Sequence, residues 1–290
     1  MADGVFCSID SGLHGPLVRH HLAVLAREEG RFDEAENHWR AVLAEHPAAD
    51  AAGLPARLGL AELYLQQSRW PELETLLTEL APHAPLDDAV LRARLHLARK
   101  EYDTARPLLD DVISQAPQII APYVILSHGL LQGGDENAAE PLLRRIVEMD
   151  AGQAESWRNL AVLYRRRHRL REAIAAAQAG RLHCPHDADL LLLHGVLLHE
   201  GGDALNAETC LLGVLESEAS DGTAQHRRTT ARQHLISLYR FLDRHREADA
   251  HKRTLAVEAP ELHRREPFAV PPASLKPHPE SSPNGQIGQA

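Results

Sequence analysis

The sequence predicts an all-α protein that consists of about seven successive helical hairpins. Three observations support this prediction: a period of 34 residues, small residues at two fixed positions of each period, and a proline that closes most periods. Aromatic residues make up only 4% of the chain, which is sparse for a domain with one large central core. We therefore expect a repeat array in which each hairpin packs mainly on its neighbours.

The repeat units follow from the 34-residue period. Three consecutive steps of 34 residues separate the unit starts at Leu86, Ile120, Ala154 and Ala188. Four extra residues (50–53) and seven extra residues (222–228) interrupt the period, and both insertions predict longer loops. The predicted units are 16–49, 54–85, 86–119, 120–153, 154–187, 188–221 and 229–262.

Small side chains recur where two helices of a hairpin would meet. The eighth position of the units is small in six of seven, and the twentieth is alanine in six of seven. Antiparallel helices approach closely only where their side chains are small. Leucines such as Leu22, Leu60 and Leu160 are expected to fill the seams between units. The eighth positions are Ala23, Ala61, Ala93, Ser127, Ala161, Gly195 and Ile236, and the twentieth are Ala35, Leu73, Ala105, Ala139, Ala173, Ala207 and Ala248.

Prolines mark the ends of most units. A proline lacks the backbone N–H and disfavours helix in the residue before it, so it ends the second helix of a hairpin. Five of the seven units carry one near the end, at Pro47, Pro85, Pro117, Pro185 and Pro260.

With these positions in place, the chain resembles the tetratricopeptide repeat (TPR) family over residues 16–262. Unit 154–187 carries the closest match, at Trp157, Leu160, Ala161, Tyr164, Ala173 and Pro185. The resemblance implies a right-handed α-solenoid, a superhelix of paired helices. It also implies a concave groove lined by the first helix of each unit, which binds a protein or peptide.

The two ends of the chain fall outside the repeats. Residues 1–15 form an extension whose Val5, Phe6, Ile9 and Leu13 are expected to cap the open side of the first hairpin, unless another domain covers it. At the other end, Lys252 replaces an apolar residue, as suits a terminal unit that faces water. Residues 263–290 are rich in proline and poor in apolar residues, so we expect a disordered tail.

The composition limits the kinds of partner and the cellular compartment that we expect for this chain. The formal net charge of −10, without a basic stripe, argues against nucleic acid as a partner. No apolar run is long enough for a membrane span, and the first residues do not resemble a secretory signal. Three cysteines without close pairing suit a cytoplasmic protein.

Nothing in the sequence predicts catalysis, a cofactor or a metal. No phosphate-binding, dinucleotide-binding, zinc-protease or nucleophile-elbow motif occurs. His183, Cys184 and His186 are interpreted as ordinary residues of a turn rather than as metal ligands. Asp187 and Asp189 are interpreted as acidic residues that stabilise a helix N-terminus.

The groove implied by the resemblance changes its chemistry along the chain. Around Leu91, Val124 and Ile125 it is mostly apolar, and toward the C-terminal half it becomes basic, which favours an acidic or carboxylate-bearing segment. For Arg165 to Arg167, an ordinary solvated helix face is an equally weighted alternative. The predicted binding residues are Arg94, His128, Arg158, Asn159, Arg165, Arg166, His234 and Arg240.

Two functions are consistent with these residues. The first is a non-catalytic scaffold that binds a protein or peptide. The second comes from residues 9–36, which resemble the start of repeat regions that follow a family 2 glycosyltransferase domain in some bacterial proteins. This second resemblance implies an accessory or detached module whose partner is a glycosyltransferase, because no catalytic domain is present.

Overall fold

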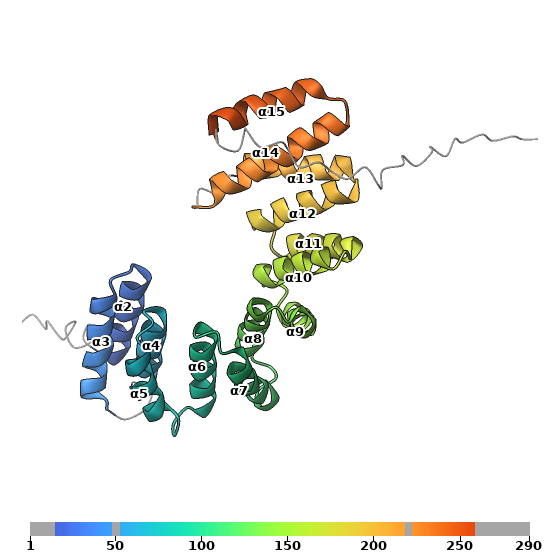
Figure 1. Ribbon diagram of the computed structural model, residues 1–290. Coiled ribbons are helices and arrows are strands. Elements are labelled where there is room, and N and C mark those ends of the chain that lie inside the picture. Colours follow the sequence, from blue (N-terminus) through green and yellow to red (C-terminus); the bar gives the residue numbers. More distant parts are fainter. Residues whose placement is uncertain (1–14, 48–52, 218–221, 259–290) are drawn as a thin grey trace, which may run out of the picture. The chain divides into compact units, whose positions relative to one another are not determined.

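The computed structural model describes residues 15–47, 53–217 and 222–258, and it contains fourteen helices and no strand within those ranges (Figure 1). The chain divides into two compact units, Met1–Arg145 (unit 1) and Ile146–Ala290 (unit 2). The predicted all-α fold class is confirmed, because consecutive helices pair into hairpins that stack within each unit. The predictions for residues 1–14 and for the tail 263–290 lie outside the described residues.

Unit 1 contains four first helices and their partners. The second and third hairpins pack on their predecessors through the contacts of α3 with α4 and of α5 with α6. The last helix crosses the division between the units. In order, the helices are α2 (Pro16–Glu28), α3 (Phe32–Glu45), α4 (Gly53–Gln66), α5 (Trp70–Leu80), α6 (Pro85–Ala98), α7 (Tyr102–Gln115), α8 (Ile120–Gly133) and α9 (Glu136–Met149).

Unit 2 contains three complete hairpins. Within it, α11 packs on α12 and α13 packs on α14, and the first helices also contact one another in the order α10, α12, α14. The helices are α10 (Ala154–Arg166), α11 (Leu170–His183), α12 (Ala188–Gly201), α13 (Ala204–Glu216), α14 (Ala224–Phe241) and α15 (His245–Glu258).

The small residues lie where the sequence predicts them. The alanines at the eighth and twentieth positions are almost completely buried, for example Ala161 and Ala173 at 0% exposure. At Gly195, an added methyl group would come within 3.1 Å of Cys210 and Leu211 on α13. The close approach of the paired helices therefore depends on these small side chains.

Every hairpin turns through a residue in the left-handed conformation, which the sequence analysis did not predict. These residues are all at the fifteenth position of a unit, and the next N–H bonds back to a carbonyl five residues earlier, as from Arg244 to Tyr239 at 2.8 Å. Only three of the seven are glycine. They are Gly30, Ser68, Lys100, Gly134, His168, Gly202 and Asp243, with φ between 58° and 83°.

Two local predictions are wrong. Residues 224–228, expected in a longer loop, extend α14, which begins at Ala224 rather than Thr229. Buried Arg227 explains this difference, because it bonds to Thr223 and pairs with Asp189 on α12 at 3.4 Å. Pro85 does not close a unit but begins α6, where its missing N–H leaves no helical bond unmade.

A similar polar cluster joins neighbouring hairpins within each unit. Between α13 and α14, Tyr239 donates to Glu208 at 2.8 Å and Arg244 pairs with the same carboxylate at 2.8 Å. The Arg244 guanidinium also lies over the Tyr239 ring, 4.4 Å from its centroid. Between α3 and α4, the equivalent residues Glu36, Tyr64 and Arg69 form the same arrangement.

Candidate functional site

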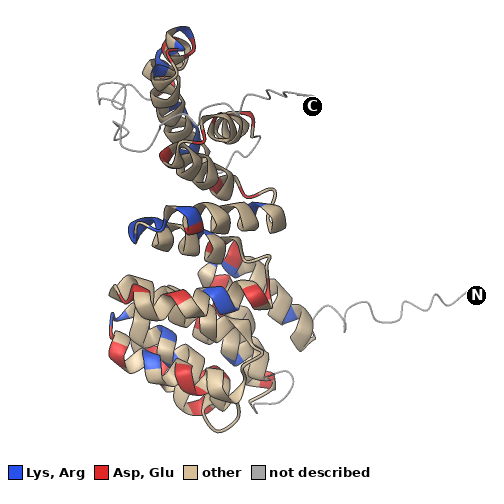
Figure 2. Ribbon diagram, turned by 90° about the vertical axis from the view of Figure 1, so that its right-hand side faces the viewer, with Lys and Arg blue, Asp and Glu red and all other residues tan. Residues whose placement is uncertain are grey.

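The candidate site in unit 2 is the side of α10, α12 and α14 that carries Arg158, Asn159, Arg165, Arg166, His234 and Arg240, here called the first-helix surface. Contacts between successive first helices hold this surface together. Figure 2 shows Lys and Arg interspersed with Asp and Glu along the helices of both units. How far each positive charge on this surface is offset therefore depends on the carboxylates next to it.

Arg158 lies between two carboxylates of the following hairpin. Its Nη1 is 2.9 Å from Asp189 and 3.6 Å from Asp187, and 30% of its side chain remains exposed. Asp187 also accepts from the N–H of Leu190 at 2.7 Å, so it caps α12 as its position predicts. The guanidinium is thus held in place, while part of it still faces solvent.

Arg165 is held in a similar way by α12. Its guanidinium forms two hydrogen bonds to the Glu200 carboxylate, one of them from Nε at 2.8 Å, and 46% of the side chain is exposed. Such a two-point contact orients the planar guanidinium. Of the other predicted residues, Arg166 and Arg240 are exposed and Asn159 is half-buried.

His234 contributes no charge to this surface at neutral pH. Burial, together with the nearby His199 and Arg165, lowers the pKa of His234 to about 4. Its Nδ1 lies 3.1 Å from Nδ1 of His199 on α12, and the two rings meet edge to face. When both rings are neutral, the Nδ1 of one ring carries a proton and donates it to the Nδ1 of the other. The basic character predicted here therefore rests on the arginines.

The predicted site residues of unit 1, Arg94 and His128, supply less positive charge than those of unit 2. Arg94 on α6 pairs with Glu62 on α4, and His128 on α8 is exposed beside Gln132, with ring nitrogen and amide 3.4 Å apart. Leu91, expected in the groove, is 4% exposed and belongs to the core beneath α4 and α5. The apolar part of the predicted groove therefore excludes Leu91.

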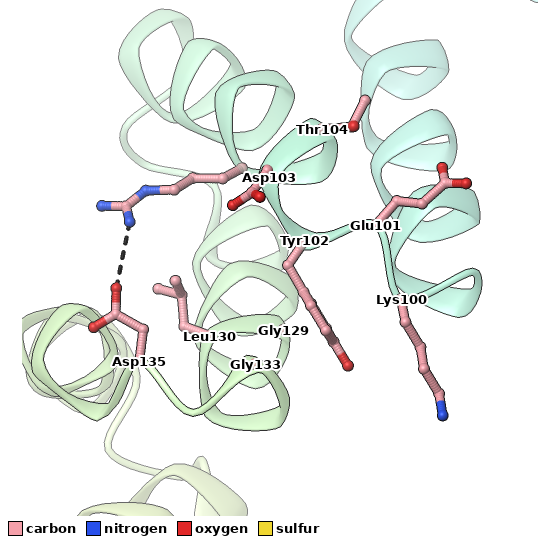
Figure 3. A pocket seen from close by; sticks show the side chains of 10 residues that line it. Lys100, Glu101, Tyr102, Asp103, Thr104, Gly129, Leu130, Gly133 and Asp135 are labelled. Atoms are coloured by element: carbon pink, nitrogen blue, oxygen red, sulfur yellow. Dashed lines mark hydrogen bonds and ion pairs between the residues drawn. The ribbon is translucent and has the colours of Figure 1, made fainter.

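Unit 1 also contains a surface cleft of about 550 Å³ beside the turn between α6 and α7 (Figure 3). Its walls combine Lys100 and Arg106 with three carboxylates, and Arg106 is 3.5 Å from Asp135. The Tyr102 ring packs beside Gly133 of α8, where a methyl group would lie 3.4 Å from the ring. The cleft offers paired charges and one aromatic ring.

The candidate ligand cluster near Pro185 is engaged in packing. His183 stacks on Trp157, with parallel rings 6.3 Å apart, and the Cys184 thiol lies 3.3 Å from the carbonyl of Gly152. Nowhere in the described part of the chain do three or more His, Cys, Asp or Glu side chains form a group that could hold a metal. Within the same part, none of the helices is both long enough and apolar enough to cross a membrane.

The sequence analysis missed the acidic partners of the site. It selected the basic residues of the first helices, whereas Asp189 and Glu200 occupy the same helix faces. Applying the positional rule to carboxylates would have found them. Buried Arg227 carried no such signal, because it lies before the predicted start of its unit.

Comparison with known proteins agrees with this geometry. Residues 26–95 match a family model described as tetratricopeptide repeat. No curated protein sequence matches the chain. In this match and in its repeated hairpins, the chain is similar to TPR proteins.

Three solved structures illustrate the shared fold. A thermophilic TPR protein of Thermus thermophilus, TTC0263, is 21% identical, covers 63% of this chain and 99% of its own, and has a TM-score of 0.52. PilF of Pseudomonas aeruginosa is 13% identical, with 71% and 91% coverage and a TM-score of 0.56. MamA is 16% identical, with 58% and 95% coverage and a TM-score of 0.52. These identities show a shared fold alone.

Proposed function

We propose that this chain is a non-catalytic scaffold that binds a protein or peptide on the first-helix surface of unit 2. The observation that carries the proposal is the state of Arg158 and Arg165. Both guanidinium groups are oriented by carboxylates of the next hairpin, and both remain partly exposed. A ligand that meets side chains already held in place loses less conformational entropy on binding.

The same contacts narrow the chemistry of the ligand. Asp187, Asp189 and Glu200 offset much of the charge of Arg158 and Arg165, so the surface does not suit a dense polyanion. A peptide with separated carboxylates fits better, because each carboxylate can share a guanidinium that has five N–H donors. Arg240, which is exposed on α14, adds further positive charge.

A charge-reversal comparison tests this proposal. The variant Arg158→Glu/Arg165→Glu/Arg166→Glu is compared with wild type for capture of ligands from the source cell extract and for affinity toward each captured ligand. A matched control, Arg171→Glu/Arg246→Glu/Arg253→Glu, makes the same charge change at exposed positions of the second helices. We expect at least a tenfold loss of affinity, about 1.4 kcal/mol, in the first variant and no loss in the control.

The outcome is interpreted only for folded protein. Circular dichroism checks both variants, and Arg158→Gln/Arg165→Gln provides a milder change if charge reversal unfolds unit 2. If the folded variants retain every ligand at wild-type affinity, the first-helix surface is not the binding site.

The alternative function, an accessory module of a glycosyltransferase, is supported by sequence resemblance alone. Residues 9–36 carry that resemblance, and those numbered 9–14 lie outside the described residues. In this alternative the scaffold is an accessory module, located in the cytoplasm, that acts through a partner enzyme. Co-purification with a family 2 glycosyltransferase from the source cells would support it, and capture of unrelated partners only would remove it.

A further inference from the structure

The first helix of the array exposes apolar side chains at positions that are buried in later first helices. At the seventh position, Leu60 of α4 and Leu235 of α14 belong to the same apolar clusters as residues of the preceding second helix. Leu63 and Leu163 at the tenth position are 0% and 1% exposed. In α2 the equivalent Leu22 and Leu25 are 42% and 53% exposed, and Leu17 is 68% exposed. Among the described residues, nothing covers Leu22, so the prediction that it fills a seam is not met there.

We propose that residues 5–13 of this chain cover the exposed face of α2. Val5, Phe6, Ile9 and Leu13 lie at spacings that a helix gathers on one side. Only His14 and Gly15 separate Leu13 from α2, a length that connects antiparallel helices. With a rise of about 1.5 Å per residue, an antiparallel pairing places Leu13 near Leu17, Ile9 near Leu22, and Phe6 near Leu25.

The size of the face favours this occupant over a second copy of the chain. A stable interface between proteins buries roughly 1,200–2,000 Å² in total, which three leucines on one short helix do not supply. A segment joined covalently to α2 needs less contact area, because its effective concentration at the face is high.

A cysteine pair tests the predicted contact directly in the full-length chain. Phe6→Cys/Leu25→Cys is prepared with Cys7→Ser and Cys184→Ser, which leaves Cys210 buried at 5% exposure. We expect an intramolecular disulfide whose yield does not change on dilution. The control pair Phe6→Cys/Asn37→Cys, with the second cysteine at an exposed position of α3, should remain reduced.

Hydrogen exchange provides the second measurement, because it does not depend on cross-linking geometry. Ile9→Glu should accelerate exchange of the α2 amides at least tenfold and leave α10 to α15 unchanged, since each repeat contacts only its neighbours. Ser8→Glu, a polar position of the same segment, serves as the control and should have no effect.

Each alternative result has a defined meaning. A disulfide between two chains would show that a second copy covers α2, and would overturn the proposal. Absence of any disulfide, or unchanged exchange in Ile9→Glu, would overturn it as well. If Ile9→Glu unfolds unit 1 as a whole, the disulfide result decides alone.

Discussion

Two neighbouring junctions of unit 2 use opposite chemistry at equivalent positions. Between α13 and α14, Glu208, Tyr239 and Arg244 form a hydrogen-bonded cluster. Between α11 and α12, the corresponding positions are Ile174, Leu198 and Asp203. Leu198 and Ile174 pack in one apolar cluster, while Asp203 turns away and accepts from the N–H of Asn206 to cap α13.

This difference shows that the repeat determines where a side chain lies at the junction, but not whether that side chain is polar or apolar. At these two junctions the three residues differ together: Glu208 is satisfied by Tyr239 and Arg244, whereas Ile174 packs with Leu198. The α3–α4 junction repeats the polar version with Glu36, Tyr64 and Arg69. A carboxylate buried at the apolar junction without such partners would cost several kcal/mol.

The largest expected effect is at the apolar junction. Leu198→Ala should lower the free energy of unfolding of the chain by about 2–4 kcal/mol, because Leu198 is 6% exposed and its loss leaves a cavity beside Ile174. Urea unfolding measures the change. Leu205→Ala, at a residue that is 74% exposed on the neighbouring helix, is the control and should change stability by less than about 0.5 kcal/mol.

The polar junction should respond more weakly to loss of one hydrogen bond. Tyr239→Phe removes the donor to Glu208 and keeps the packing of the ring, so we expect a loss of about 1 kcal/mol. Tyr64→Phe should give a similar value at the α3–α4 junction. A negligible change in both variants would mean that the cluster is incidental to stability.

The two junctions should also differ in their response to acid. Hydrogen bonds from Arg244 and Tyr239 lower the pKa of Glu208, although burial opposes the shift. The unfolded chain therefore binds the proton more readily, and this stabilisation is complete above the unfolded pKa of about 4.3 and declines as the pH falls below it. The stability gap between wild type and Glu208→Gln should shrink when unfolding is measured at about pH 3.5 instead of about pH 7. A constant gap would contradict this pKa assignment.

The smallest expected effect comes from the turns that precede these junctions. Gly202 and Asp243 occupy equivalent turn positions with φ of 82° and 58°. Because aspartate pays a steric cost in this conformation that glycine avoids, Asp243→Gly should stabilise the chain by about 0.5 kcal/mol. Thermal unfolding should show a small rise in Tm, and Asp249→Gly, within α15, should lower it instead.

Sequence reasoning predicted most of the fold and less of the site. The unit starts at Pro16, Ile120, Ala154 and Ala188 coincide with helix starts, because the periodic small and apolar residues report directly on helix pairing. It failed at α14, where Arg227 gains its partner from another helix, and at α2, where Leu22 is 42% exposed among the described residues. For the first-helix surface it selected Arg158 and Arg165 but not the carboxylates that hold them.

The sequence by itself determined the fold class, the hairpin period and the small residues at which paired helices meet, since these depend on spacing within one unit. Only the tertiary structure decided which charges oppose each other. Arg158 meets Asp189 across 31 residues and Arg165 meets Glu200 across 35, each close to one full repeat along the chain. Such pairs form because stacking places one hairpin beside the next, so the repeat position of each residue is set by the sequence but its contact is set by the stacking.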